Sequence, residues 1–464
     1  MYFEQFYLGC LAHASYLLGS EGEAVVVDPQ RDVDLYLKAA EEHGLKIRHI
    51  VETHLHADFV SGHSELAART EAKIYIGAQA LAQFPHVPVA DDFELRFGRC
   101  KLKVLETPGH TPESICLVVT SDDKPASPWA VLTGDTLFLG DVGRPDLSRT
   151  HTPRQLAGML YDSLHSKLMT LSDDVLVYPA HGAGSLCGRN MRAERSSTIG
   201  TERLTNYALQ IKTREKFVQD LTSNLPTRPE YFAQDAEINR QGAPALSALP
   251  ELMPISAQEL KRLLEEEGVI ALDVRPNEQY AVGHVPGSVN IALSGQFASW
   301  AGAMLGLSSR PVLIADSDDQ ISEARMRLAR IGLETERGYL KNGIKDWQEA
   351  GFELPQLPQI GHQELNDLLK QGRIDVLDVR REPEWFAGHI EAANWWPLDR
   401  FKVSPPEIDL SRPLAVHCKS GYRSMIACSL LERAGFRNVI NLTGGFDAWQ
   451  QAGLPVEVEK PVLA

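Results

Sequence analysis

The stretch Ile50-Val-Glu-Thr-His54-Leu-His56-Ala-Asp58-Phe59-Val-Ser-Gly-His63 decides how the rest of the chain is interpreted. A short apolar run ends in His-x-His-x-Asp, so three side chains that can bind a metal occupy alternate positions. On an extended backbone, alternate side chains point to the same side. A buried metal needs such convergence, because each ligand has to be desolvated and held in a fixed direction. The stretch therefore predicts a metal site directly after a β-strand.

Three later segments carry further side chains of this kind. They read Thr107-Pro-Gly-His110, Leu132-Thr-Gly-Asp135-Thr and Tyr178-Pro-Ala-His181-Gly. Each follows an apolar run that is typical of a buried strand, at residues 102–106, 129–132 and 175–178. Loops at strand ends hold their side chains in fixed positions because the strands are rigid. We therefore expect these segments to complete the site.

The pattern up to about residue 250 alternates between strands and helices. Further strands are predicted at residues 23–28, 48–52, 73–76 and 114–120, and helices at residues 33–43 and 64–70. Residues 191–221 are expected to be mostly helical. Residues 222–254 are rich in Pro, Ala and Gln, so we expect a structured tail or linker there. Residues 1–251 are predicted to form the first domain.

The composition argues against several classes of protein. A chain of 464 residues, 43% of them hydrophobic, predicts roughly two to four globular domains. The formal net charge of −16 argues against a nucleic-acid partner. No apolar stretch of about 18 residues predicts a membrane span, and the N-terminus lacks a signal-peptide pattern. The 6 cysteines show no regular spacing, which argues against a disulfide framework, so we expect a cytoplasmic protein.

Beyond about residue 252 the chain repeats itself. Leu272-Asp-Val-Arg275, followed by Gly283-His284, recurs as Leu377-Asp-Val-Arg380, followed by Gly388-His389. The spacing between the two parts is the same in both copies. A Gly-x-x-x-Trp segment near the end of each copy also recurs, with Trp347 and Trp449 as counterparts. Two small α/β domains are therefore predicted, at residues 252–356 and 357–464.

The two copies differ after one of their strands. In the second copy, a strand at residues 414–417 leads into Cys418-Lys-Ser-Gly-Tyr-Arg423 and then into helical sequence. A cysteine between a strand end and a helix start lies under unpaired backbone N–H groups and the positive end of the helix dipole, and both stabilise a thiolate. Lys419 and Arg423 add positive charge. We interpret Cys418 as a nucleophile that binds an anion or carries a second sulfur atom.

A structural role is the usual interpretation of a lone cysteine, and the Lys-Ser-Gly-Tyr-Arg sequence after Cys418 argues against it. Cys428, on the apolar face of the next helix, is expected to be a core residue. The first copy has no cysteine at all, and its corresponding loop contains acidic residues, which repel anions. These residues are Asp316, Asp318 and Asp319.

Residues 252 to about 460 resemble the rhodanese family. The resemblance rests on the Asp-Val-Arg strand, the Gly-His turn, the six-residue loop from Cys418 to Arg423 and the Gly-Gly-Phe-x-x-Trp signature. It implies sulfur transfer through a persulfide on Cys418. The first copy departs from the family pattern because it offers no nucleophile. We predict that this copy is catalytically silent and acts as a spacer or docking platform.

The first domain, through about residue 220, resembles the metallo-β-lactamase superfamily. The resemblance implies an αββα sandwich, so the expected fold class is α/β, with this sandwich followed by two rhodanese-like α/β domains. One or two isolated histidines would more commonly be core or surface residues, but here six positions match the superfamily in order and spacing. They are His54, His56, Asp58, His110, Asp135 and His181.

Phe59 bears on the number of metal ions. Two-zinc hydrolases of the superfamily, such as the glyoxalase II type, usually have histidine at this position, where it helps to hold the second metal. Phenylalanine cannot bind a metal, so a full second site is disfavoured. The resemblance then implies a single Fe(II) per N-terminal domain, held by His54, His110 and Asp135. Two histidines and one carboxylate with open positions are characteristic of non-haem iron oxygenases; zinc is the alternative metal.

Other polar groups are expected around the metal. The resemblance leaves His56 and His181 to orient water or substrate, although spacing alone would admit His56 as a ligand. Asp58 could hold a ligand histidine through a hydrogen bond, and His63 is expected to be structural. Cys187 is either a buried cysteine in a Gly-rich loop or a thiol near the mouth of the iron site that accepts sulfur or responds to oxidation. Two arginines, Arg189 and Arg192, could bind the anionic tail of a carrier thiol.

The segment Leu139-Gly-Asp-Val-Gly-Arg144-Pro-Asp146 resembles the persulfide dioxygenase branch of the superfamily. That branch oxidises a low-molecular-weight persulfide to sulfite, and sulfite accepts rhodanese-bound sulfur to give thiosulfate. Arg144 is then a substrate-binding candidate. Two other hypotheses stay open: a two-zinc thioester hydrolase with an appended rhodanese module, and a non-enzymatic persulfide-binding scaffold. The expected partners are a thiol persulfide, O2, sulfite and thiosulfate, in a homo-oligomer without nucleic acid or membrane.

Overall fold

A computed structural model of the chain describes residues 1–121, 127–223, 225, 228–402, 406, 408, 409 and 411–458. Contacts divide these residues into two compact units. The first contains residues 1–249 and 329–332, and the second contains residues 250–328 and 333–464. Among the described residues, no helix is long and apolar enough to cross a membrane.

The first unit contains two six-stranded sheets. Strands of one sheet follow one another in chain order: β1 (Tyr2–Leu8), β2 (His13–Ser20), β3 (Glu23–Val27), β4 (Lys46–Glu52), β5 (Lys73–Gly77) and β6 (Val87–Val89). The other sheet is built from β7 (Glu94–Phe97), β8 (Cys100–Glu106), β9 (Ile115–Ser121), β10 (Ala130–Gly134), β11 (Leu176–Pro179) and β12 (Ser197–Thr198). Apolar side chains of both sheets, such as Tyr16, Val25 and Leu117, form one buried cluster.

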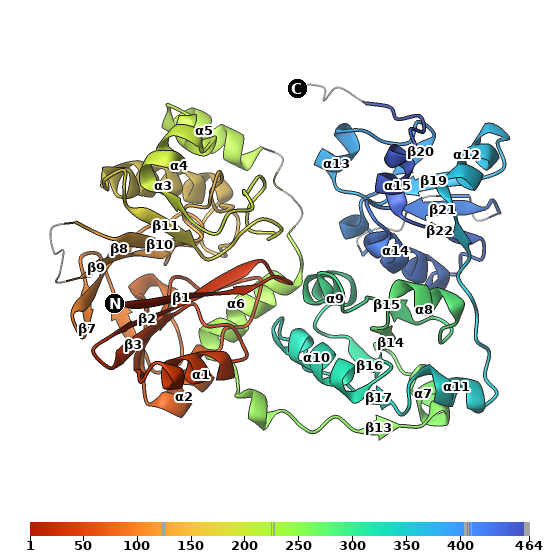
Figure 1. The fold of residues 1–464 in the computed structure, drawn as a ribbon, viewed down its shortest axis with the longest axis horizontal. Helices are drawn as coiled ribbons and strands as arrows, with labels where there is room; N and C mark the ends of the chain where they lie inside the picture. The colour runs from red at the N-terminus through yellow and green to blue at the C-terminus, as the bar shows by residue number, and fades with distance from the viewer. Residues whose placement is uncertain are drawn as a thin grey trace. The chain divides into compact units, whose positions relative to one another are not determined.

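Helices cover the outer faces of the two sheets. Figure 1 shows α1 (Asp34–Glu42) and α2 (His63–Thr70) against the first sheet, and α3 (Pro153–Ser166), α4 (Ile199–Thr205) and α5 (Arg214–Thr222) against the second. The resulting order of layers is the predicted αββα sandwich. Each layer buries its apolar face against the next, which is how such architectures gain their hydrophobic stabilisation.

Several elements of this unit were not expected from the sequence. Strands β1 and β2 and helix α3 lie in segments for which we predicted no element. Helix α3 has a clear start signal, because Thr152 and Gln155 form a capping box and Pro153 follows the cap. The prediction of mostly helical sequence at 191–221 is wrong for its first part, since residues 191–196 are irregular and β12 follows. The predicted tail contains a regular helix, α6 (Tyr231–Gln241).

The second unit contains two parallel five-stranded sheets with the same connectivity, which is the structural counterpart of the sequence repeat. One has the strand order β13-β17-β16-β14-β15 and the other β18-β22-β21-β19-β20. The first copy comprises β13 (Pro254–Ile255), α7 (Ala257–Leu263), β14 (Val269–Asp273), α8 (Asn277–Val282), β15 (Val289–Asn290), α9 (Phe297–Leu305), β16 (Arg310–Ile314), α10 (Asp318–Ala329), β17 (Gly338–Leu340) and α11 (Ile344–Glu349).

The second copy has the corresponding elements in the same order, except that its described residues contain no counterpart of α9 and have a short 3-10 helix, Leu398–Arg400, in that interval. They are β18 (Gln359–Ile360), α12 (His362–Lys370), β19 (Asp375–Asp378), α13 (Glu382–Phe386), β20 (Ala393–Trp395), β21 (Leu414–His417), α14 (Tyr422–Arg433), β22 (Val439–Leu442) and α15 (Gly445–Gln451). The two acidic residues that we placed in a loop of the first copy, Asp318 and Asp319, instead form the first turn of α10, and only Asp316 lies in the loop.

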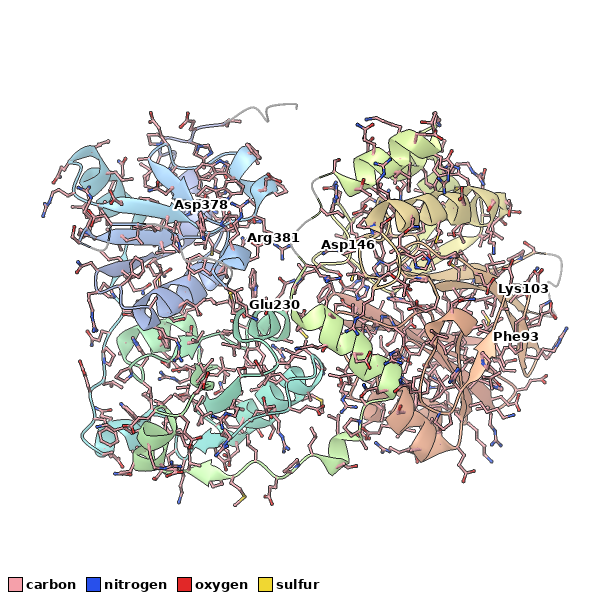
Figure 2. The ribbon with its side chains drawn as sticks, turned by 180° about the vertical axis from the view of Figure 1, so that it is seen from behind. Phe93, Lys103, Asp146, Glu230, Asp378 and Arg381 are labelled. Carbon is pink, nitrogen blue, oxygen red and sulfur yellow. The ribbon has the colours of Figure 1, made fainter. Side chains whose placement is uncertain are left out.

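The repeated Asp-Val-Arg motif has the same structural role in both copies. Arg380 donates two hydrogen bonds to Asp378, which is labelled in Figure 2, and one to the carbonyl oxygen of Gly388. Arg275 contacts Asp273 and the carbonyl oxygen of Gly283 in the same way. The buried guanidinium thus connects the end of the strand to the Gly-His turn. Because this contact supports the fold, the motif is needed in both copies, including the one without a cysteine.

Candidate metal centre and reactive cysteine

Three of the predicted metal ligands meet at the strand ends of the first unit. His54 follows β4, His110 follows β8, and Asp135 follows β10. The Oδ2 atom of Asp135 lies 3.4 Å from His110 Nε2 and 3.9 Å from His54 Nε2. One donor atom from each residue lies within 4.8 Å of the other two, and all three side chains are buried. The two sheets therefore bring together residues that are up to 81 positions apart, from His54 to Asp135.

These three side chains fit a divalent metal ion. His110 Nε2 and Asp135 Oδ2 are buried and have no hydrogen-bond partner among the described residues. The other nitrogen of each histidine is occupied: His54 Nδ1 lies 3.0 Å from Thr53 Oγ1, and His110 Nδ1 lies 2.9 Å from the carbonyl oxygen of Arg144. Such contacts fix the ring orientation and leave Nε2 available to a metal.

The charge states of the triad also suit a metal. Burial lowers the pKa of both His54 and His110 below the usual range, which favours the neutral imidazole that a metal requires. Burial alone would raise the pKa of Asp135, but the surrounding histidines, His181 foremost, outweigh it and lower that pKa. The group therefore offers two neutral nitrogens and one carboxylate, the donor set expected from the sequence.

His56 faces away from this group. Its Nε2 atom lies 3.2 Å from Asp28 Oδ1 and 3.5 Å from Glu52 Oε2, and all three side chains are buried. Burial by itself would lower the pKa of His56, but the carboxylates of Asp28 and Glu52 outweigh it and raise that pKa. The structure thus places His56 beside the triad, with its ring 4.1 Å from that of His54, but gives it other partners.

His181 connects two acidic residues at the site. Its Nδ1 atom lies 2.7 Å from Asp135 Oδ1, and its Nε2 atom lies 2.9 Å from Asp58 Oδ2. These carboxylates raise the pKa of His181 well above the usual range, although burial opposes them. Asp58 therefore contacts His181 and not a histidine of the triad. Cys187 lies close enough to Asp58 and His181 for the three to form a second group with metal-binding potential.

Phe59 is fully buried among aromatic rings. Its ring centroid lies 4.4 Å from that of His56 and 4.1 Å from that of His13. His13 comes from β2 and was missed in the sequence, because it belongs to no metal-binding pattern. Both of its ring nitrogens are buried without a hydrogen-bond partner among the described residues, and burial lowers its pKa.

Asn239 is a second residue that the sequence did not reveal. It lies on α6, in the segment interpreted as a tail or linker, and its side chain is buried against the loop after β4. Its amide nitrogen donates to the carbonyl oxygens of His56 (2.7 Å) and Phe59 (2.8 Å), and its amide oxygen accepts from the Ser61 N–H (2.8 Å). The predicted tail therefore holds the loop that carries the metal-binding motif.

The three arginines predicted to bind substrate have partners within the unit, and Arg192 donates to the Glu202 carboxylate and to the Thr205 hydroxyl. The guanidinium of Arg144 forms a two-point ion pair with Asp146, which Figure 2 labels, and the backbone N–H of Arg144 donates to the carbonyl oxygen of Cys187. Arg189 donates to the carbonyl oxygens of Leu221 and Ser223. A small cavity of about 10 Å³ lies between Arg144 and Cys187. Burial raises the pKa of the Cys187 thiol, and the acidic Asp58 and Asp135 raise it further.

In the second unit, Cys418 lies between β21 and α14, as predicted. Its side chain is 1% exposed, and the backbone N–H of Gly421 donates to its Sγ atom at 3.2 Å. Gly421 has a φ of +113°, a conformation that favours glycine and lets the loop fold over the sulfur. Lys419 is exposed. Arg423 is paired with Glu384 through two hydrogen bonds of 2.6 and 2.7 Å, so its charge is partly balanced by a residue that we had not predicted.

The copy without a cysteine contributes to the surroundings of Cys418. A pocket of about 410 Å³ is lined by Cys418, Tyr422 and Arg423 from one copy and by Ser294, Gln296 and Trp300 from the other. The hydroxyl of Tyr422 donates to the carbonyl oxygen of Ala292 at 2.9 Å. The copy without a cysteine therefore forms part of the wall around Cys418, and its role as a spacer or docking platform stays a prediction.

Comparisons with known proteins agree with this division of the chain. Residues 8–181 match the metallo-beta-lactamase superfamily, and residues 256–350 and 361–452 each match the rhodanese-like domain. The persulfide dioxygenase ETHE1 of Homo sapiens is 31% identical over 220 residues, which cover 46% of this chain and 77% of that protein. The hydroxyacylglutathione hydrolase of Francisella philomiragia is 32% identical over 172 residues, 37% of this chain and 63% of the relative.

A solved structure extends the likeness beyond the first unit. The metallo-beta-lactamase structure from Staphylococcus aureus has a TM-score of 0.65 and 34% sequence identity, and the match covers 73% of this chain and 98% of that one. Together with the family matches, this confirms the expected fold class: a metallo-β-lactamase sandwich followed by two rhodanese-like domains.

Proposed function

The chain belongs to the metallo-beta-lactamase superfamily and continues into two rhodanese-like domains, and on this premise we propose that it couples two steps of sulfur chemistry. In the first step, a low-molecular-weight thiol persulfide is oxidised by O2 to sulfite at a mononuclear non-haem iron in the first unit. In the second, Cys418 transfers sulfane sulfur to sulfite and forms thiosulfate. Together the two steps would detoxify sulfide.

The oxygenase proposal rests on one observation, the composition of the buried triad. His54, His110 and Asp135 supply two imidazoles and one carboxylate, while Phe59 offers no donor. This donor set with open positions is typical of iron(II) oxygenases, because an anionic substrate and O2 can then meet at one ion. The similarity to persulfide dioxygenases supports the same assignment.

The protein's own residues would hold and shield this site. Thr53 Oγ1 and the Arg144 carbonyl oxygen orient the rings of His54 and His110. His181 holds the carboxylate of Asp135 through its Nδ1 atom. The fully buried Phe59 keeps its side of the site apolar and excludes water there, which protects a reactive sulfur intermediate from side reactions.

Sulfur transfer would take place at the second site without a metal. The sulfur of sulfite attacks the outer sulfur of a Cys418 persulfide, and the bond between the two sulfur atoms of the persulfide breaks. Its electron pair stays on Cys418 as a thiolate, and thiosulfate leaves. The Gly421 N–H, 3.2 Å from Sγ, is placed to stabilise that thiolate.

Oxygen consumption by the metal-loaded protein tests the first step. We expect the protein to retain about one equivalent of iron and to consume O2 when a persulfide is added, with sulfite as the product. Retention of two zinc equivalents, without O2 uptake, would contradict the proposal. Cys418→Ser should abolish thiosulfate formation and leave sulfite production intact; loss of O2 uptake in this variant would contradict independent sites.

A two-zinc thioester hydrolase with a sulfur-binding module is the second candidate function. The similarity to hydroxyacylglutathione hydrolases favours it, as does the second buried group of potential ligands: Asp58, His181 and Cys187. It predicts that zinc-loaded protein hydrolyses acylated thiols such as S-acylglutathione. The same preparations, assayed with persulfide and with thioester, would discriminate between the two candidates.

A further inference from the structure

His56 lies close enough to the triad to be a candidate for a third histidine ligand of the metal. It lies two residues after His54 in the same loop, and its ring centroid is 4.1 Å from that of His54. Spacing alone would admit it as a third imidazole ligand. Its Nε2 atom nevertheless lies 3.2 Å from Asp28 Oδ1 and 3.5 Å from Glu52 Oε2. The two carboxylates therefore face this nitrogen as ion-pair partners, although neither ring nitrogen of His56 has a hydrogen-bond partner among the described residues.

Both carboxylates are held firmly in place. Asp28 accepts hydrogen bonds from the Thr53 N–H at 2.7 Å and from the Thr53 hydroxyl at 2.9 Å. Glu52 accepts from the Ser61 hydroxyl at 2.6 Å, and His63 Nδ1 lies 3.3 Å from the same oxygen. Asp28 and Glu52 are 1% exposed. Rotation of His56 toward the metal would leave two buried carboxylates without their imidazole partner, which is costly in a low-dielectric interior.

The backbone also indicates that Asp28 has a specific task. It directly follows β3 and has a φ of +51°, a conformation that non-glycine residues seldom adopt. Such a residue persists only where the surroundings compensate for it, and it commonly marks a functional site. Through Thr53, the same carboxylate reaches the hydroxyl that lies 3.0 Å from His54 Nδ1. Asp28 is thus in contact with Thr53, which supports His54, and with His56 itself.

We propose that Asp28 and Glu52 are positioning residues that hold His56 out of the coordination sphere and so limit the metal to two imidazole ligands. Asp28 orients His54 through Thr53 toward the metal, and its carboxylate lies 3.2 Å from the Nε2 atom of His56. Glu52 binds the same nitrogen of His56 from the preceding strand. Phe59, whose ring is 4.4 Å from His56, packs against the imidazole in this position. The inference rests on the proposed metal triad but does not depend on the identity of the substrate.

Cobalt(II) substitution can count the imidazole ligands directly. In the proton NMR spectrum of a cobalt-loaded protein, each coordinated imidazole contributes one strongly shifted N–H signal that exchanges with water. We expect two such signals for the wild-type chain, from His54 and His110. We expect three for the double variant Asp28→Asn/Glu52→Gln, because His56 is then free to turn toward the cobalt. The substitution Glu52→Gln preserves the shape of the side chain, which limits any effect on folding.

Two further variants test whether the third signal comes from His56 and whether it depends on Asp28 and Glu52 in particular. Glu65→Gln changes another buried carboxylate of this unit, which contacts the Leu246 N–H, and should keep two signals. Adding His56→Asn to the double variant should remove the third signal. Three signals in the wild type, or two in the double variant, would overturn the inference. Fewer than two in the wild type would contradict the triad itself. If the signal counts are as expected but the protein does not oxidise persulfide, only the proposed function is contradicted.

Discussion

The Nδ1 atom of His181 lies 2.7 Å from Oδ1 of Asp135, so a histidine outside the metal triad holds the carboxylate inside it. We predict that His181→Phe weakens iron binding, because Asp135 then loses the partner that orients it. Changes to such supporting residues typically cost about 10–100-fold in metal affinity. Competition with a chelator of known affinity would measure this loss in the full chain.

His165→Phe is the matched control for this substitution. His165 lies in the same unit, on α3, and contacts the ring of Tyr161 away from the triad. It should keep the wild-type iron affinity. Equal affinities for the wild type and His181→Phe would show that Asp135 is oriented without help from His181.

Asn239 should contribute to the stability of the metal-binding loop. Asn239→Ala removes three hydrogen bonds and leaves the buried carbonyl oxygens of His56 and Phe59 without this donor. We expect the free energy of unfolding of the first unit to fall by about 1–3 kcal/mol, the usual cost of unsatisfied buried polar groups. Urea denaturation, followed by tryptophan fluorescence of the full chain, would measure the change.

Asn190→Ala provides the control for that prediction, because Asn190 is exposed and only its backbone N–H contacts Asp141. It should have a stability within about 0.5 kcal/mol of the wild type, as most surface substitutions do. A similar loss in both variants would mean that the contacts of Asn239 have no particular importance for the loop.

The sequence was sufficient to predict which residues come together at the candidate metal site and where Cys418 lies in its domain. His54, His110 and Asp135 could be predicted because each belongs to a short motif after a strand, and each motif contains a side chain that can bind a metal. Cys418 could be predicted because a strand, a glycine-containing loop and a helix follow one another locally. Such features depend on neighbouring residues, which is the information that a single sequence contains.

The supporting residues could not be predicted in the same way. Asn239 binds the carbonyl oxygen of Phe59, which is 180 positions away in the sequence, and it lies in a segment whose composition indicated a structured tail or linker. His13 and Glu384 stand in no motif, and only the folded chain brings them to Phe59 and Arg423. The partners of His56 were also hidden, because spacing reports which residues are near one another but not which way a ring turns. These contacts depend on tertiary packing, which local patterns do not encode.

Cys187 should react slowly with alkylating agents. It is 1% exposed, and burial together with Asp58 and Asp135 raises the pKa of its thiol, whereas alkylation requires the thiolate. We therefore expect little iodoacetamide labelling of Cys187 at neutral pH, and an increase only in alkaline solution. Peptide mass spectrometry after timed labelling would measure it. The partly exposed Cys10 serves as the internal reference, and labelling of Cys187 as fast as that of Cys10 would contradict the prediction.

The ion pair of Glu384 with Arg423 should make the stability of the second unit depend on pH. Although burial opposes it, Arg423 lowers the pKa of Glu384 below the usual value. A carboxyl group whose pKa is lower in the folded state stabilises the fold above its unfolded pKa of about 4.3, and this contribution is lost as the pH falls through the folded pKa. Glu384→Gln should therefore destabilise the unit by about 1–3 kcal/mol at pH 7, because the partly buried guanidinium loses a charged partner.

In acid, where Glu384 of the wild type is itself protonated, the difference between wild type and variant should shrink toward zero. Urea denaturation at a series of pH values would measure it. Glu382→Gln, at an exposed position in the same helix, should stay close to the wild-type curve throughout, because the Glu382 side chain has no ion pair or hydrogen bond among the described residues. A difference between wild type and Glu384→Gln that stays constant from neutral to acid pH would show that the shape of the side chain, and not its charge, holds Arg423 beside Cys418.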